Sequence, residues 1–229
     1  MGLFQGFGPQ TVRFLEDLED HNDRDWFKAN KHRYDSDVLE PALDFITAMG
    51  PRIEKISECF TAIPKRMGGS LMRVYRDTRF SKDKTPYKTN IGIQFRHERG
   101  KDVHAPGYYL HIETTGCFLG AGIWHPESGV LRAIRERISS KPDEWQRVLS
   151  AKSFNDTYTL GGDSLKRPPR GFGEDTPHLD DVKRKDFIGV CDFSIGEAAS
   201  AKFADQVAKR FVKASPLMRF LCAAAEVEF

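Results

Sequence analysis

Cysteine and long apolar runs are both scarce in this sequence. Its 229 residues include four cysteines, Cys59, Cys117, Cys191 and Cys222, and none of them forms a C-x-x-C pair. A chain of this length can bury an adequate core without cross-links, so we expect reduced, structural thiols in the interior. No stretch approaches the ~20 apolar residues of a membrane span. The start, MGLFQGFGPQ, lacks the basic and apolar regions of a signal peptide. These absences favour a cytoplasmic protein with no membrane partner.

The familiar nucleotide and hydrolase motifs are also absent. The sequence contains no G-x-x-x-x-G-K-[ST] loop, no G-x-G-x-x-G and no G-x-S-x-G elbow. His97-Glu98 lacks the second histidine of an H-E-x-x-H metal motif. We therefore predict no cofactor, and the motifs leave open whether the protein is an enzyme.

Net charge is only +2, which argues against a generally basic nucleic-acid-binding protein. The positive charge is concentrated in the segment RVYRDTRFSKDKTPYKTN, residues 73–90, which carries six cations and two acids. This local balance of +4 leaves −2 for the remainder of the chain. Concentrated cations with interleaved hydroxyl and aromatic residues are typical of a site that binds an anion.

Short apolar runs predict an α+β fold with a central antiparallel sheet. The runs at 71–75, 91–95, 108–112 and 117–124 are rich in β-branched and aromatic residues and are separated by turn residues, so we expect a meander around 71–124. Residues 107–113 and 117–123 should pair across the turn TTG. A further strand is expected at 187–194, and residues 155–177 should form an ordered loop.

Helices are predicted at both ends of the chain. Residues 10–58 have helical periodicity, with breaks or kinks expected at Pro41 and at Gly50-Pro51. Further helices should begin near Pro126, Pro142, Ser194 and Pro216, the third of them through a capping box with Glu197. We expect a single domain over residues 1–229, with residues 1–9 as a flexible or loosely packed tail.

The candidate site is built around residues 73–90. Three arginines there would hold a phosphate or carboxylate, tyrosines would supply walls and hydroxyls, and Asp77 would orient an arginine or act as a general base. Lys84 and Arg170 are weaker candidates, the latter from the segment 166–172, provided that this segment converges with 73–90. The candidate ligand-binding residues are Arg73, Tyr75, Arg76, Arg79, Lys84, Tyr87, Tyr108 and Arg170. The alternative is that Asp77 and Asp83 form structural ion pairs with these arginines.

A metal site is a weaker possibility. His111 and Glu113 are two residues apart on a predicted strand and therefore share a face. His104 or His125 could complete a site with two histidines and one carboxylate. This combination matches no known spacing, so we favour exposed polar positions on a strand and predict no metal.

Several motifs together resemble one protein family. They are Asn22, Trp26 and Phe27 as N-x-x-x-W-F, the run 73–90, APGYYLHI at 105–112, GAGIWHP at 120–126 and PRGF at 169–172. The chain resembles the family catalogued as domain of unknown function 2461 over nearly its whole length. The resemblance implies one domain of this length and assigns no activity or site residue.

The sequence thus favours a cytosolic protein whose cationic pocket binds a small ligand bearing phosphate or carboxylate. Whether that pocket is catalytic stays open, as does the oligomeric state. One alternative is a module that binds a nucleic-acid backbone or an acidic protein partner, although the near-neutral charge counts against nucleic acid. The other is a structural protein with no ligand site.

Overall fold

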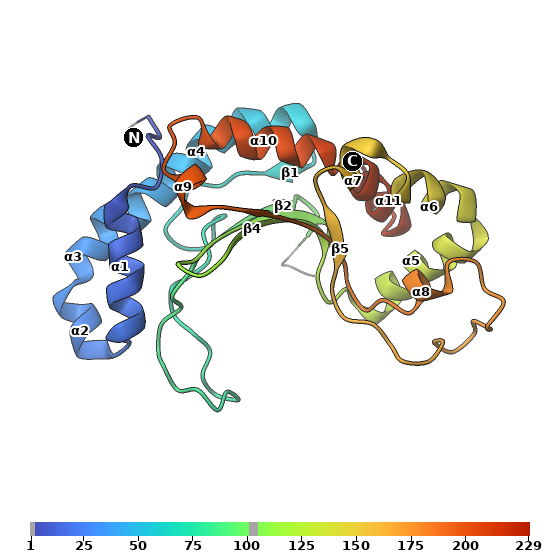
Figure 1. Ribbon diagram of the computed structural model, residues 1–229, viewed down its shortest axis with the longest axis horizontal. Coiled ribbons are helices and arrows are strands. Elements are labelled where there is room, and N and C mark those ends of the chain that lie inside the picture. The colour runs from blue at the N-terminus through green and yellow to red at the C-terminus, as the bar shows by residue number, and fades with distance from the viewer. Residues whose placement is uncertain (1–2, 101–104) are drawn as a thin grey trace.

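A computed structural model describes residues 3–100 and 105–229, and its centre is one antiparallel sheet (Figure 1). The strand order is β1-β2-β3-β4-β6-β5, and every neighbouring pair is antiparallel. The predicted α+β class is therefore confirmed. The strands are β1 Phe60–Thr61, β2 Ile91–His97, β3 Gly107–Ile112, β4 Cys117–Ile123, β5 Thr159–Gly161 and β6 Phe187–Phe193.

The hairpin of β3 and β4 forms across TTG as predicted, with Leu110 opposite Leu119. The strand predicted at 71–75 is wrong. Leu71 makes an isolated bridge to Ile93, and Tyr75 makes another to Tyr87. One end of the segment pairs with β2 and the other with the residues around Tyr87, so the segment forms no continuous ladder with either partner. The predicted loop at 155–177 contains the short strand β5, which adds to the sheet edge beside β6.

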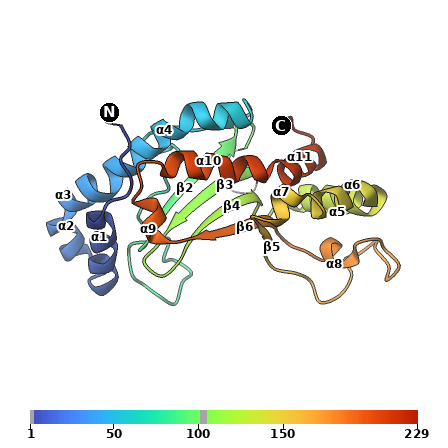
Figure 2. The same ribbon diagram turned by 45° about the horizontal axis from the view of Figure 1, so that its top comes forward.

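Helices cover one face of the sheet and form two flanks that extend past its other face (Figure 1). In Figure 2, α4 and α10 lie side by side over the strands, while α1, α2 and α3 form one flank and α5, α6 and α8 the other. The helices are α1 Pro9–Asp20, α2 Arg24–Ala29, α3 Lys31–Arg33, the π-helix η1 Tyr34–Leu39, α4 Glu40–Ile56, α5 Ser128–Ser140, α6 Pro142–Leu149, α7 Lys152–Asn155, α8 Leu179–Val182, α9 Ile195–Ala198, α10 Phe203–Lys213 and α11 Ser215–Ala224.

Proline has less effect on the long N-terminal helix than the sequence predicts. Pro41 lies in the first turn of α4, which continues directly from η1. Its missing N–H would have bonded to the carbonyl of Asp37, and the buried Thr11 hydroxyl donates to that oxygen instead, at 2.6 Å. The break predicted at Gly50-Pro51 is wrong, since α4 continues through Pro51 to Ile56.

The sequence predicts a flexible or loosely packed tail at residues 1–9, but within residues 3–9 two side chains pack against the core. Phe4 and Phe7 are buried, and both rings contact Phe45 of α4. The backbone N–H of Phe7 donates to the carbonyl of Ala198 at 2.8 Å. These two aromatic side chains anchor a glycine-containing segment to the core. The capping box of Ser194 and Glu197 forms as predicted at α9.

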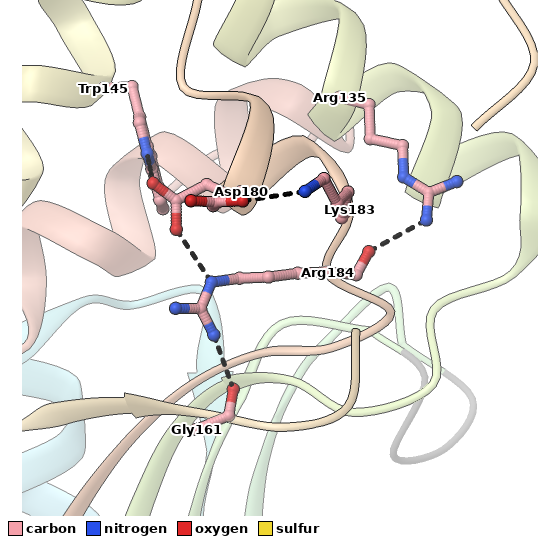
Figure 3. Close-up of polar contacts among 7 residues, drawn as sticks. Arg135, Trp145, Gly161, Asp180, Lys183 and Arg184 are labelled. Carbon is pink, nitrogen blue, oxygen red and sulfur yellow. Dashed lines mark hydrogen bonds and ion pairs between the residues drawn. The ribbon is translucent and has the colours of Figure 1, made fainter. Parts of the chain in front are cut away.

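A polar network fixes the flank that contains α8 (Figure 3). Asp181 accepts from the Trp145 indole and from Arg184 Nε, both at 2.8 Å, while Arg135 donates to the carbonyl of Arg184 at 2.9 Å. Arg184 also reaches the carbonyl of Gly161 at 3.5 Å, and Lys183 pairs with Asp180 at 2.9 Å. These contacts join α5, α6 and α8 to the edge of the sheet.

Candidate functional site

Residues 73–90 form a projecting loop whose two arms pair with each other (Figure 1). Arg76 N–H donates to the Pro86 carbonyl at 2.9 Å, and Lys88 N–H donates to the Val74 carbonyl at 2.8 Å. The side chain of Asn22 clamps one arm, because it accepts from Tyr87 N–H and donates to the Tyr87 carbonyl, both at 3.0 Å. The loop is thus an ordered, clamped extension of the sheet edge.

Most of the predicted anion-binding donors are used inside this loop. Arg76 binds Asp83 and the Thr85 hydroxyl, and Arg79 makes a bidentate pair with Asp77 at 2.9 and 2.6 Å. Lys84 donates to the Thr78 carbonyl at 2.9 Å. The Arg79 hydrogen bonds lower the pKa of Asp77 to about 2, and the Thr85 N–H followed by Arg76 lowers the pKa of Asp83 to about 2. Asp77 is therefore a paired carboxylate and a poor general base.

Three cations of the segment, Arg73, Lys82 and Lys88, have no such partner in the described part of the chain, and Lys82 is exposed. Neither the Lys88 ammonium nor the Arg73 guanidinium hydrogen-bonds or pairs with an acid in the described part of the chain. Partial burial, together with the nearby charge of Arg73, lowers the pKa of Lys88. A half-buried ammonium without an acceptor is a place where an anion would be stabilised.

The three tyrosines of the predicted site lie in different environments. Tyr75 is about half exposed, while Tyr87 is buried and stacks on Phe27 with ring centroids 4.0 Å apart. The Tyr108 ring lies on the helix-covered face, fully buried beside Phe211, although the residue also borders a hollow on the open face of the sheet. The alternation of a strand places the side chain of Tyr109, which the prediction did not name, on the open face.

Two hollows flank Lys88. The smaller, about 330 Å³, lies between the loop and the end of α1, and its charged lining residues are Glu19, Arg76, Asp83 and Lys88. The larger is a trough of about 550 Å³ on the open face of the sheet. Lys88 lines both hollows.

Glycines form much of the floor of this trough. Pairing of Tyr109 with Gly120, and of Gly120 with Val190, places these residues in one row across the open face. Gly107 and Gly122 form part of the next row. A strand rises about 3.3 Å per residue, so the stretch from Phe118 to Trp124 spans about 20 Å. The residues lining the trough include Met72, Lys88, Gln94, Tyr109, Phe118, Trp124, Ile188 and Val190.

A hydrogen-bonded chain lies beside Lys88 on the same face. The Tyr109 hydroxyl lies 3.0 Å from His111 Nδ1, and His111 Nε2 lies 3.4 Å from Glu113. The amide nitrogen of Asn90 can only donate, and it lies 3.4 Å from the same Nδ1. His111 Nδ1 therefore accepts, and Nε2–H faces the carboxylate.

Burial affects the protonation states of His111 and Tyr109 in this hydrogen-bonded chain. It lowers the pKa of His111, although Glu113 opposes the shift, and it raises the pKa of Tyr109 to about 12. At neutral pH the site holds an uncharged imidazole and an intact phenol. A Cβ at Gly92 would stand 2.8 Å from the Tyr109 hydroxyl oxygen, so a larger residue there would displace the end of this side chain.

The other predicted features do not join this site. The segment 166–172, with the exposed Arg170, and the loop 73–90 lie at opposite ends of the molecule in Figures 1 and 2. The two segments therefore do not converge, and the condition for including Arg170 in the site is not met. His111 and Glu113 do share a face, but in the described ranges no group of three His, Cys, Asp or Glu could hold a metal ion. His104 lies outside the described residues.

A comparison with protein-family models gives one match. The family described as conserved hypothetical protein (DUF2461) matches residues 10–220. The chain belongs to this family. No curated protein and no solved structure is similar enough to count as a match. The DUF2461 match includes both the 73–90 loop and the strands that form the trough.

Sequence reasoning missed the roles of Lys88 and Tyr109 in this DUF2461 protein. In the strand YYLHI, alternate residues share a face, so Tyr108 lies on the core side with the apolar Leu110 and Ile112, and Tyr109 lies on the opposite face. That signal was present in the sequence. Lys88 was counted among the cations, but its lack of a partner is decided by the folding of the whole loop. No helix in the described residues has the length and apolar character to cross a membrane.

Proposed function

We propose that this protein binds a small organic anion, bearing phosphate or carboxylate, in the trough on the open face of its sheet. The observation that carries the proposal is Lys88, a half-buried cation with no acceptor in the described part of the chain, which lines a hollow of about 550 Å³. Lys88 would contact the anionic group, while Tyr109 and Gln94 would bond to polar groups further in.

The character of the trough supports a small ligand with an apolar or aromatic part. Its volume lies within the roughly 300–1,000 Å³ that is typical of small-molecule sites. Phe118 and Trp124 offer aromatic surface, and the glycine floor lets a flat group approach the backbone. We further infer a cytoplasmic location, because the four cysteines are free thiols.

The competing function is binding of a polymer by the projecting loop. Phe80 is 94% exposed near the loop tip, and Arg79 lies over its ring at 5.7 Å. Exposed aromatic and cationic side chains of this kind stack on single-stranded nucleic acid. We favour the small ligand, because Arg76, Arg79 and Lys84 already have partners within the loop.

The proposal is tested by calorimetric titration with phenyl phosphate, benzoate and the neutral benzyl alcohol. We expect the two anions to bind and Lys88→Met to weaken them about 10- to 100-fold, the effect of losing one charge-assisted contact. Lys82→Met is the matched control, since Lys82 is exposed in the same loop and lines neither hollow. It should bind as the wild type does.

A second variant tests the location. A Cβ at Gly120 would meet only ordinary van der Waals contacts, the nearest 3.5 Å away, so Gly120→Leu should fold and fill the trough. We expect it to lose binding with an unchanged melting temperature. Equal affinity in Lys88→Met and Lys82→Met would refute the proposal. Weakening by Lys82→Met together with single-stranded oligonucleotide binding would support the polymer instead.

A further inference from the structure

A histidine and a buried carboxylate lie next to Trp124 and Gly162, two residues that line the trough. Ile123 of β4 pairs with Phe187 of β6, so the next residues outward, Trp124 and Asp186, face each other across the two strands. They share strand parity with Gly122 and Ile188, which line the trough. His125 follows Trp124, and its ring stacks on the indole with centroids 4.2 Å apart.

Asp186 is buried and accepts three hydrogen bonds. Its Oδ1 accepts from the backbone N–H of His125 at 2.7 Å and from His125 Nδ1 at 2.6 Å. Its Oδ2 accepts from the backbone N–H of Asp163 at 3.1 Å. The Asp186 side chain is 2% exposed, whereas the His125 side chain is 49% exposed. The carboxylate is therefore fixed inside the protein, while the imidazole it holds extends to the surface.

Two residues next to the contact between His125 and Asp186 have unusual backbone angles. His125 has φ of 46°, in the left-handed region that non-glycine residues seldom occupy. Gly162, at the trough, has φ of 101°, and a Cβ there would stand 2.5 Å from the Cβ of Asp186. Two backbone N–H donors alone would satisfy the carboxylate, so the third bond, to Nδ1, serves to orient the ring.

His21 provides an internal comparison. Its ring also stacks on an indole, that of Trp26, with centroids 5.7 Å apart. Its Nδ1 contacts the backbone carbonyl of Asp17 at 3.0 Å instead of a buried carboxylate. The His125 arrangement thus differs from a generic surface histidine by its negative, desolvated partner.

We propose that His125 is a general base beside the trough, positioned by Asp186. With Nδ1–H donated to the carboxylate, Nε2 carries the lone pair. In the described part of the chain no hydroxyl or thiol side chain hydrogen-bonds to this imidazole, so the group it activates is water.

The reaction class we assign is hydrolysis of a carboxylic ester. Nε2 accepts a proton from water as the water oxygen bonds to the ester carbonyl carbon. The ester C–O bond then breaks, and the proton passes from Nε2 to the departing alkoxide. The products are an acid and an alcohol, and no further reactant is needed. This activity does not require an anion at Lys88, so it can hold or fail independently of the proposed function.

The test uses the neutral ester p-nitrophenyl butyrate at pH 8. His125→Asn retains a residue that tolerates the left-handed conformation, and we expect it to hydrolyse the ester about 100-fold more slowly than the wild type. His21→Asn should match the wild type. Equal rates for the two variants, or a wild-type rate no higher than that of buffer, would overturn the proposal.

The positioning role of Asp186 has its own readout. In the wild type, ¹⁵N spectra of His125 should show the tautomer protonated at Nδ1, and Asp186→Asn should shift the population toward the Nε2–H form while slowing hydrolysis. A wild-type ring protonated at Nε2 would contradict the proposal, even if Asp186→Asn failed to fold.

Discussion

The two faces of the sheet differ in what their alternating residues do. On the helix-covered face, Ile93, Phe95 and Leu110 are fully buried against α4, α10 and their neighbours. On the other face the same strands present Gln94, Tyr109 and glycines. A solvated face of an antiparallel sheet usually carries a full set of polar side chains. This one is hollowed.

The difference indicates that the helix-covered face contributes most of the stability, while the open face is available for binding. Removing side chains from the covered face would leave a cavity in a close-packed interior. On the open face, Gly107, Gly120 and Gly122 have no side chains, and the space above them is the trough in which we propose that a ligand binds. Each of the following measurements asks whether that separation holds.

The largest expected effect is on stability. Phe95→Ala removes a fully buried ring from the covered face and should cost about 3–5 kcal/mol of the free energy of unfolding. Ile188→Ala, on the open face, should cost about 1 kcal/mol, because its side chain is only partly buried. Urea unfolding measures both. Equal losses would mean that the open face is packed like a core and that the contrast between the faces is false.

A smaller effect should appear in the pH dependence of stability. Burial lowers the pKa of His111, so the unfolded chain binds the proton more tightly than the folded one. The resulting contribution is complete above the unfolded value of about 6.5 and is lost as the pH falls from there toward the folded pKa. We expect His111→Gln to lose less stability than the wild type between pH 7.5 and 5. Parallel curves in urea unfolding would contradict this expectation.

Sequence patterns predicted the sheet better than they predicted the site. Apolar runs predicted the four long strands, because such runs must be buried on at least one face. The error at Leu71–Tyr75 arose because that segment divides its backbone bonds between β2 and the loop arm at 86–88. Thr11, which bonds to the carbonyl left free by Pro41, could not be identified from local sequence, because the two segments meet only in the fold.

The candidate site depended on two different kinds of information. Tyr109 could be assigned to the open face from strand parity alone. Arg76 pairs with Asp83, and Lys88 has no partner among the described residues, because of how the loop closes. His125 and Asp186 are 61 positions apart and belong to different motifs, so no spacing rule connects them.

The most direct measurement is a map of amide shifts in ¹⁵N-labelled protein titrated with phenyl phosphate. Ligand in the trough should shift the amides of Tyr109, Gly120 and Gly122 together with that of Lys88, while the amide of Gly171, in the distant 166–172 segment, stays unchanged. Shifts confined to the loop tip at 77–85, with the strand glycines unaffected, would contradict a binding site on the open face of the sheet.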